Sequence, residues 1–441
     1  MALVLSHAVI VTVDARDRVL RDHDLRIDGT TISAIGPGGS LARPGDRVID
    51  CANGLVMPGF VNTHTHATLG LFRGLADDKT RAFWPEGGYR VPGQERFGEA
   101  DYRRSLADAC AEFLLNGVTC IADRVAAMDA YAPIIEASGL RASVGSTLVD
   151  LAGPADWGPT ERLIERYGTD PARSRIVAGI APHALDTCSD ALLRECGERA
   201  RRAGARVYLH VAQCQAEIDA IRRRGHGGAL SCLRCAGLTG PDVVAAHAIY
   251  LDRDEEEGWC RDGTAICHCP ASNLKIEART LPLNRYADDV PVGLGTDWTA
   301  SNNAMDMFWE MRLAGLVGKM QADDPTVLPT ARMLRLATLD GARVLGIDHL
   351  VGSVEVGKRA DLVVLDLNQP EMRPLHDPVS NIVHSASPRS VRDVLVDGEI
   401  RVRGGKLLVP PEAWTSELPS PAGSSGARPE QAGRACGLSN R

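Results

Sequence analysis

The stretch ARVYLHVA at residues 205–212, followed by AEIDAIRRRG at residues 216–225, sets the pattern for the middle of this 441-residue chain. A short apolar run is typical of a buried strand, and the amphipathic run after it is typical of a helix. The same order returns in GVTCIAD with DAYAPIIEASG, in RIVAGIAPH with SDALLRECGERARRAG, and in DVVAAHAIYL with DRDEEEGWCRDG. About eight such units between residues 58 and 349 predict an α/β fold, specifically a (β/α)8 TIM barrel.

The two ends of the chain have a different pattern. Apolar and polar residues alternate in VLSHAVIVTVD and DLRIDGTTISAIG near the N-terminus, and in DLVVLDL and SVRDVLVDGEIRVRGG toward the C-terminus. This alternation predicts antiparallel strands in residues 1–57 and 350–412. Residues 413–441 are rich in Pro, Gly, Ser and Ala, a composition that predicts a disordered tail.

The overall composition excludes several classes of partner. Hydrophobic residues make up 44% of the chain and charged residues 24%, and the formal net charge is −8. Because no block of five or six basic residues is present, we expect neither nucleic acid nor anionic lipid as a partner. No apolar run approaches the roughly 18 residues that a membrane span requires, and the N-terminus lacks the features of a signal peptide.

The 12 cysteines are scattered through the chain, several of them inside apolar runs. This distribution predicts buried free thiols in a reducing compartment, so we expect a cytoplasmic protein. Cys232-x-x-Cys235 and Cys267-His268-Cys269 have a weak likeness to zinc-binding pairs. The second pair has only one residue between its cysteines, so we favour buried thiols over a structural zinc site.

Five polar side chains lie near the ends of predicted strands. His64 and His66 are two residues apart in VMPGFVNTHTHATLG, and residues i and i+2 of a strand point to the same face. His210, His247 and Asp297 lie near the ends of three further strands. Because the carboxyl ends of barrel strands converge, these five residues predict a mononuclear metal site.

Several motifs resemble one known family. PGFVNTHTH, APHALDTCS, LHVA, HCPASNLK, GLGTDWTASNN and GSVEVGKRADLVVLD are similar to those of the amidohydrolase superfamily, in its branch of cytosine, guanine and S-adenosylhomocysteine deaminases and triazine chlorohydrolases. The resemblance covers roughly residues 1–410. It implies a small β-sandwich domain, built from residues 1–57 and 350–412, beside a hydrolase barrel at residues 58–349.

The resemblance also implies a ligand set. His64, His66, His210 and Asp297 would hold the metal, and His247 would lie near the metal-bound water. Zinc is expected, with iron(II) as the alternative. Such an ion lowers the pKa of its water from 15.7 toward about 7. Asp297 could then act as general base and acid, while His247 hydrogen-bonds the nucleophile or the developing oxyanion.

One position departs from the family pattern. The deaminases of this branch have a glutamate three residues after the third histidine, and it carries protons to the substrate ring. Here the residue is Gln213, whose amide can hydrogen-bond a substrate but cannot carry a proton. A simple purine or pyrimidine deaminase is therefore disfavoured. We expect Glu217, four residues later, to be a solvated helix residue.

Three further residues are predicted to contact the substrate. His183, in APHALDTCS, matches a position that contacts substrate in this branch. Trp84 lies in the segment LFRGLADDKTRAFWPEGGYR, which is typical of a loop over the pocket. Trp298, directly after Asp297, could stack on a flat ligand.

The sequence therefore predicts a zinc-dependent hydrolase that attacks an sp2 carbon and cleaves a C–N bond of an amide, an amidine or an aminated heterocycle. One alternative is removal of a segment from a modified peptide natural product. A second is a triazine-type chlorohydrolase, and a third is an inactive metal-binding scaffold. A homo-oligomer is expected from the resemblance alone.

Overall fold

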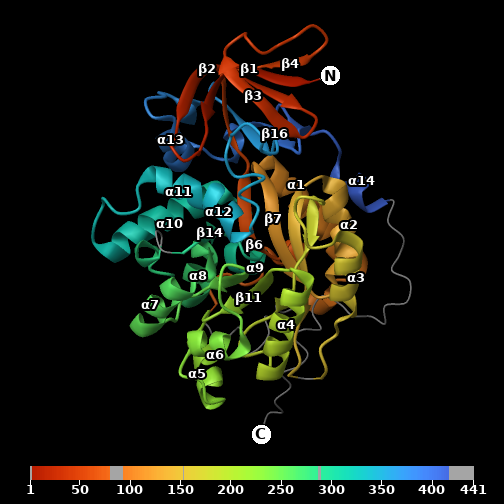
Figure 1. Ribbon diagram of the computed structural model, residues 1–441, viewed down its shortest axis with the longest axis vertical. Coiled ribbons are helices and arrows are strands. Elements are labelled where there is room, and N and C mark those ends of the chain that lie inside the picture. Colours follow the sequence, from red (N-terminus) through yellow and green to blue (C-terminus); the bar gives the residue numbers. More distant parts are fainter. Residues whose placement is uncertain (1, 80–92, 152, 287–289, 417–441) are drawn as a thin grey trace.

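A computed structural model describes all residues of the chain except 1, 80–92, 152, 287–289 and 417–441. The molecule has two parts (Figure 1). One part is a β-sheet to which both ends of the chain contribute, and the larger part consists of alternating strands and helices. The prediction of an α/β fold is thus confirmed.

Nine strands form a single sheet in the order β18-β17-β16-β15-β5-β1-β2-β3, with β4 paired to β1. These strands are β1 (Leu3–Val11), β2 (Val19–Asp28), β3 (Thr31–Pro37), β4 (Arg47–Asp50), β5 (Gly54–Pro58), β15 (Leu362–Asp366), β16 (Val391–Val396), β17 (Glu399–Arg403) and β18 (Lys406–Leu407). The antiparallel pairing of β5 with β15 joins the two chain ends. The resemblance implied a two-layer sandwich, whereas the hydrogen bonds connect these strands into one sheet.

The direction of two strands differs from the prediction, because β1 runs parallel to both β4 and β5. The loop 38–46 returns the chain to the beginning of β1. There the Asp46 carboxylate accepts a hydrogen bond from Ala2 N at 3.2 Å and pairs with Arg26 at 2.5 Å. β4 and then β5 therefore follow β1 in its own direction. Alternation of residues fixes the face of each side chain but not the direction of the strand.

The middle of the chain forms two parallel sheets. The first sheet contains β6 (Phe60–Thr65), β7 (Val118–Val125), β8 (Arg141–Leu148), β9 (Ile176–Ala178) and β10 (Ala181–Pro182). The second contains β11 (Val207–Val211), β12 (Val243–His247), β13 (Ala265–His268) and β14 (Val292–Leu294). Isolated bridges connect the sheets at both seams: Thr65 with Asp297, Ile180 with Val207, and Ala184 with His210.

The backbone hydrogen bonds thus define two separate sheets, whereas the sequence predicted one closed barrel. Between β6 and β14, side-chain hydrogen bonds take the place of some backbone hydrogen bonds. Thr63 Oγ1 donates to Leu294 O at 2.9 Å, and Thr296 N donates to Asn62 Oδ1 at 3.2 Å. These side-chain bonds occupy main-chain groups that a regular strand pair would use.

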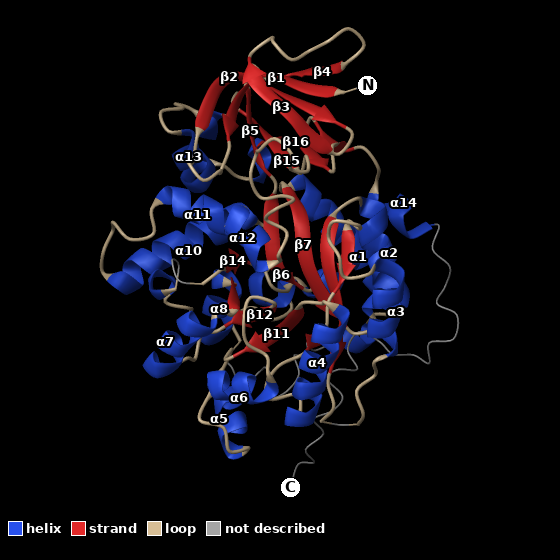
Figure 2. Cartoon of the chain, in the orientation of Figure 1, coloured by secondary structure: helices blue, strands red, loops and turns tan. Residues whose placement is uncertain are grey.

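Helices surround the parallel sheets (Figure 2). They are α1 (Glu99–Leu115), α2 (Met128–Ser138), α3 (Gly158–Tyr167), α4 (Asp190–Ala203), α5 (Gln215–Arg223), α6 (Ala229–Ala236), α7 (Arg253–Asp262), α8 (Pro270–Glu277), α9 (Thr299–Asn302), α10 (Met307–Ala322), α11 (Thr330–Leu336), α12 (Leu339–Val344), α13 (Pro378–Ser380) and α14 (Pro411–Ser416). Their apolar faces and the strands share one large hydrophobic cluster, while the nine-stranded sheet has a cluster of its own. Helix α14 buries Trp414 and so continues past the predicted start of the tail at residue 413.

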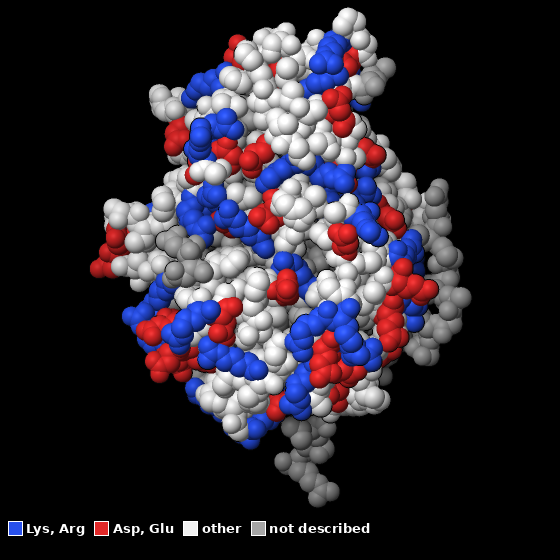
Figure 3. Space-filling view, in the orientation of Figure 1, with Lys and Arg blue, Asp and Glu red and all other residues white. Residues whose placement is uncertain are grey.

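The surface and the thiols agree with the composition. Lys and Arg alternate with Asp and Glu over the face shown in Figure 3. Among the described residues, no helix is both long and apolar enough to cross a membrane. The 11 described cysteines are free thiols and nine of them are buried, as predicted.

Candidate metal centre

The five side chains predicted as a metal site lie together at the carboxyl ends of the parallel strands. His64 and His66 come from the end of β6, His210 and His247 from β11 and β12, and Asp297 follows β14. One ligand-type atom from each of His64, His210, His247 and Asp297 lies within 4.8 Å of the others. His66 Nε2 lies 3.3 Å from His210 Nε2 and 3.5 Å from Asp297 Oδ1. The structure therefore brings all five residues together.

Three of these histidines are held through Nδ1 by an oxygen atom. The pairs are His66 with Arg124 O at 2.7 Å, His210 with His183 O at 2.7 Å, and His247 with Asn273 Oδ1 at 2.8 Å. A neutral imidazole that donates through Nδ1 keeps a free lone pair on Nε2, which is the form that binds a metal. Burial lowers the pKa of His66 to about 4, so the ring is neutral at pH 7.

The carboxylate of Asp297 is oriented by both of its oxygens. Oδ1 lies 3.2 Å from His64 Nε2, and Oδ2 accepts hydrogen bonds from Ser272 Oγ at 2.6 Å and Ser301 Oγ at 3.3 Å. Burial raises the pKa of Asp297. The contact with His64, together with the nearby His247 and His66, outweighs burial and holds this pKa well below its ordinary value. Asp297 is therefore ionised, with Oδ1 directed at the histidines.

The backbone at two of these residues is strained. His247 has φ +79° and Asp297 has φ +57°, both in the left-handed region that residues with a Cβ rarely adopt. Each such residue costs of the order of 1–3 kcal/mol and persists where the surrounding structure requires it. This strain turns both side chains toward the cluster and is typical of a functional site.

Sequence reasoning missed three residues that support the cluster. Ser272 and Asn273, in the motif HCPASNLK, hold Asp297 and His247. Arg124, which is 4% exposed at the end of β7, donates from Nη2 to His64 Nδ1 at 2.9 Å. The signal for Arg124 was available, because Asp123 and Arg124 place two charges in the run GVTCIADRV, a strand that should be buried.

The residues predicted to bind substrate lie in different surroundings in the structure. The His183 ring centroid lies 4.8 Å from that of His210, which places His183 beside the cluster. Gln213 is buried and lies two residues beyond the end of β11. Trp298 is buried and packs edge-on against Phe72, 6.1 Å between ring centroids, so its indole belongs to the hydrophobic core. Trp84 lies outside the described residues.

The expectation for Glu217 is wrong. This side chain is 2% exposed, and its Oε2 accepts a hydrogen bond from Gln213 N at 2.8 Å. Burial, together with the charge of Asp186, raises the pKa of Glu217 to about 8. Helix spacing alone could not reveal this, because Asp186 and the main chain of Leu185, which lie near Glu217, come from the turn after β10. Glu217 therefore fixes the main chain at Gln213.

We predict that Glu217 makes stability fall as pH rises from about 5 to about 8. In this window the folded state keeps the Glu217 proton that the unfolded state has already lost, so rising pH favours unfolding. Melting temperatures of the native protein and of Glu217→Gln should diverge across these pH values, with the native protein losing more. Glu257→Gln, at an exposed position of α7, should follow the native curve. Parallel curves for all three proteins would contradict the prediction.

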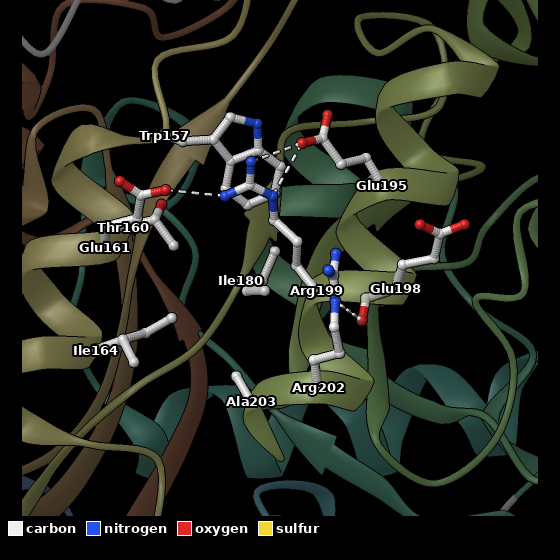
Figure 4. Close-up of a pocket in the computed structure, with 10 residues that line it drawn as sticks. All are labelled: Trp157, Thr160, Glu161, Ile164, Ile180, Glu195, Glu198, Arg199, Arg202 and Ala203. Carbon is white, nitrogen blue, oxygen red and sulfur yellow. Dashed lines mark hydrogen bonds and ion pairs between the residues drawn. The ribbon is translucent and has the colours of Figure 1, made fainter.

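A large cavity lies away from this cluster, between α3 and α4. Figure 4 shows its lining, and its volume is about 630 Å3. Arg199 lies 4.0 Å above the Trp157 ring and pairs with Glu161 at 2.9 Å and Glu195 at 2.8 Å. No predicted site residue in the described part of the chain lines this cavity. The His/Asp cluster is therefore a separate site.

Three or more imidazoles and one carboxylate, converging at the carboxyl ends of parallel strands, fit a divalent transition metal. The fit is supported by Nε2 of His247, which is buried and has no hydrogen-bond partner among the described residues. These features define the class of metal-dependent hydrolases.

Comparisons with known proteins identify the family. Residues 55–401 match the amidohydrolase family. The 5'-deoxyadenosine deaminase of Methanosarcina mazei is 36% identical, covering 92% of this chain and 94% of the relative. The 5-methylthioadenosine/S-adenosylhomocysteine deaminase of Pelotomaculum thermopropionicum is 35% identical with the same two coverages, 92% and 94%. This chain belongs to the amidohydrolase family, and the prediction of a hydrolase is confirmed.

Solved structures agree with this assignment. A zinc-bound adenosine deaminase from Xanthomonas campestris has a TM-score of 0.86 and 31% identity, covering 93% of this chain and 95% of that chain. The triazine hydrolase from Arthrobacter aurescens has a TM-score of 0.84 and 25% identity, covering 92% of this chain and 96% of that chain. Both are similar to this chain over nearly its whole length.

We predict that replacing His64 and His66 together with Ala removes one equivalent of divalent metal from the protein. Both imidazoles adjoin the Asp297 carboxylate, at 3.2 and 3.5 Å, so their loss leaves too few ligands in the cluster. Metal analysis after dialysis would measure the change. The matched control replaces the exposed His349 and His376 with Ala and should keep the full metal content. Unchanged metal in the His64/His66 double variant would refute the assignment.

Proposed function

We propose that this chain hydrolyses a C–N bond in a small aminated heterocycle of the nucleoside type and releases ammonia. The buried His/Asp cluster carries this proposal, because it supplies the groups that hydrolysis requires. The relatives named above are deaminases of adenosine derivatives and support this choice of substrate. They oppose the expectation drawn from Gln213, which disfavoured a purine deaminase. A modified peptide finds no such support among them.

The proposed ligands are His64, His66, His210 and Asp297, with zinc as the expected ion and iron(II) as the alternative. His66 and His210, which donate through Nδ1 to carbonyl oxygens, keep the Nε2 lone pair that suits either ion. The zinc-bound adenosine deaminase with 31% identity supports a divalent metal. When bound, the ion acidifies a water molecule and polarises the carbon that the water attacks.

Asp297 is the proposed proton carrier. Its ionised Oδ1 can accept the proton of the attacking water, and the same carboxyl can give that proton to the departing nitrogen. Ser272 and Ser301 hold Oδ2, so Oδ1 stays directed at the reacting groups. His247 donates through Nδ1 to Asn273, which leaves Nε2 to accept a hydrogen bond from the attacking water.

Gln213 and His183 are the proposed substrate contacts. An amide at position 213 can donate a hydrogen bond to a ring nitrogen without moving a proton. Glu217 holds the main chain at that residue, which favours one fixed position for the amide. His183 bonds Thr187 Oγ1 through Nδ1 at 2.8 Å, so its Nε2 remains for the substrate. Trp84 remains a proposed substrate contact.

For the fold we propose that residues 58–349 act as one (β/α)8 barrel. The two parallel sheets and the bridges at both seams favour this arrangement. Residues 1–57 and 350–412 would form the separate β domain, for which the sandwich implied by the resemblance remains a proposal. A cytoplasmic location and a homo-oligomer are likewise proposals.

The test is ammonia release by the metal-loaded protein. Candidate substrates are 5'-deoxyadenosine, 5'-methylthioadenosine and S-adenosylhomocysteine, with a chlorotriazine and a cyclic amide for comparison. We expect metal-dependent release of ammonia from at least one nucleoside. Chloride release from the triazine, or ring opening of the cyclic amide, without ammonia from any nucleoside would contradict the proposed substrate class.

A further inference from the structure

We propose that Asp190, His226 and Cys232 form a second metal site, which binds a zinc ion through three protein ligands. One ligand-type atom from each residue lies within 4.8 Å of the others. Asp190 is the first residue of α4, His226 lies in the turn between α5 and α6, and Cys232 lies in α6. A carboxylate, an imidazole and a thiolate together suit zinc better than magnesium or calcium, which prefer oxygen ligands alone.

The contacts within this trio resemble those in the His/Asp centre. His226 Nε2 lies 3.0 Å from Asp190 Oδ2. In the His/Asp centre, His64 Nε2 lies 3.2 Å from Asp297 Oδ1. Direct contact between a histidine nitrogen and a carboxylate oxygen is thus shared by both clusters, and in each an ion would replace that contact.

The three side chains of the trio differ in their exposure to solvent. Cys232 is 1% exposed, whereas the side chains of His226 and Asp190 are 11% and 34% exposed. An ion can therefore enter beside Asp190 and meet the thiol at the inner end. Water can supply the remaining position of a tetrahedral site from the Asp190 side.

Arg224 sets the electrostatic balance of the trio. Its Nη2 lies 2.9 Å from Asp190 Oδ1 and 3.5 Å from Cys232 Sγ, and Nη1 donates to two main-chain carbonyls of residues 185 and 188. The guanidinium therefore occupies Oδ1 and leaves Oδ2 for the ion. A zinc ion, one carboxylate and one thiolate are neutral together, so the positive charge of Arg224 remains the only net charge.

Binding requires that the thiol lose its proton. Burial raises the pKa of Cys232 to about 11, and the charge of Arg224 acts in the opposite direction. Zinc must therefore displace this proton: a Zn–S bond forms, the S–H bond breaks, and one proton leaves to the solvent. No oxidation or reduction is involved.

The position of the trio indicates its role. Helices α4 and α6 pack against each other, and α5 and α6 lie at the end of the molecule opposite the nine-stranded sheet (Figure 1). The segment that carries His226 and Cys232 begins just after Gln213, while Asp190 follows the turn that begins at His183. An ion at the trio would fix the two segments that adjoin both proposed substrate contacts.

Cobalt(II) provides the test, because the His/Asp centre contains no sulfur ligand. The full chain, freed of metal by a chelator, would be titrated with Co2+. Sulfur-to-cobalt charge-transfer absorption in the near ultraviolet reports thiolate ligation and so distinguishes this site from the first. We expect about two equivalents bound, one at each site, with this absorption appearing for one of them.

Cys232→Ser should lose the absorption and one equivalent, and His226→Asn should lose the same equivalent. Cys235→Ser, three residues along α6 at an exposed position, should keep both. Retention of the other equivalent shows in every variant that the chain is folded. Absence of charge-transfer absorption in the native protein, or its persistence in Cys232→Ser, would overturn the proposal.

Discussion

Asp297→Asn will lower turnover by a factor of about 10² to 10⁴, which is the usual value of one positioned proton-transfer group. The amide can occupy the same volume and can still accept a hydrogen bond from Ser272, which lies 2.6 Å from Oδ2 in the native protein. It cannot take a proton from water at neutral pH. Steady-state turnover with the best substrate of the panel would measure the loss.

Metal content must be measured on the same preparation, because Asn is also a poorer ligand than Asp. If the variant keeps its metal but is inactive, the loss of turnover comes from lost proton transfer. If the variant has lost its metal, the loss of turnover comes from weaker metal binding. Asp242→Asn is the matched control, since the Asp242 side chain is 79% exposed at the start of β12. Near-normal turnover in metal-loaded Asp297→Asn would place the base elsewhere.

Gln213→Glu will lower the native activity by about 10-fold to 100-fold, the equivalent of roughly 1–3 kcal/mol for a buried hydrogen bond lost with a charge added. Gln213 is 6% exposed, and Glu217 already accepts a hydrogen bond from its main-chain nitrogen at 2.8 Å. A carboxyl at position 213 would lie near that of Glu217 and be poorly solvated, and when ionised it could not donate a hydrogen bond to the substrate. Ammonia release under kcat/KM conditions would measure the change.

Gln215→Glu is the matched control, because it makes the same substitution two residues later at an exposed position. It should leave activity unchanged. A large gain of ammonia release in Gln213→Glu would instead show that the native protein lacks a proton carrier that its chemistry needs. That outcome would contradict the role proposed for Asp297 as the only carboxyl that moves protons.

The sequence predicted that the five side chains of the His/Asp cluster would lie together, because strand ends carry them. His64 and His66 follow from the two-residue period of a strand, and His210 and Asp297 from the convergence of parallel strands. The cysteine pair at 232 and 235 shows the limit of spacing arguments. Cys235 is exposed, and the ligand-type neighbours of Cys232 are Asp190 and His226, which no short motif contains.

The sequence by itself determined the order of strands and helices, the histidines and the aspartate at the strand ends, and the absence of a carboxyl at position 213. Periodicity and residue chemistry are local properties, so they can be read without knowing which segments meet. Only the tertiary structure decided that β4 and β5 run parallel to β1, that Glu217 is buried, and that Arg124 donates to His64. Each of these depends on contacts between segments far apart in the chain, and burial, pKa and strand direction are set by those contacts.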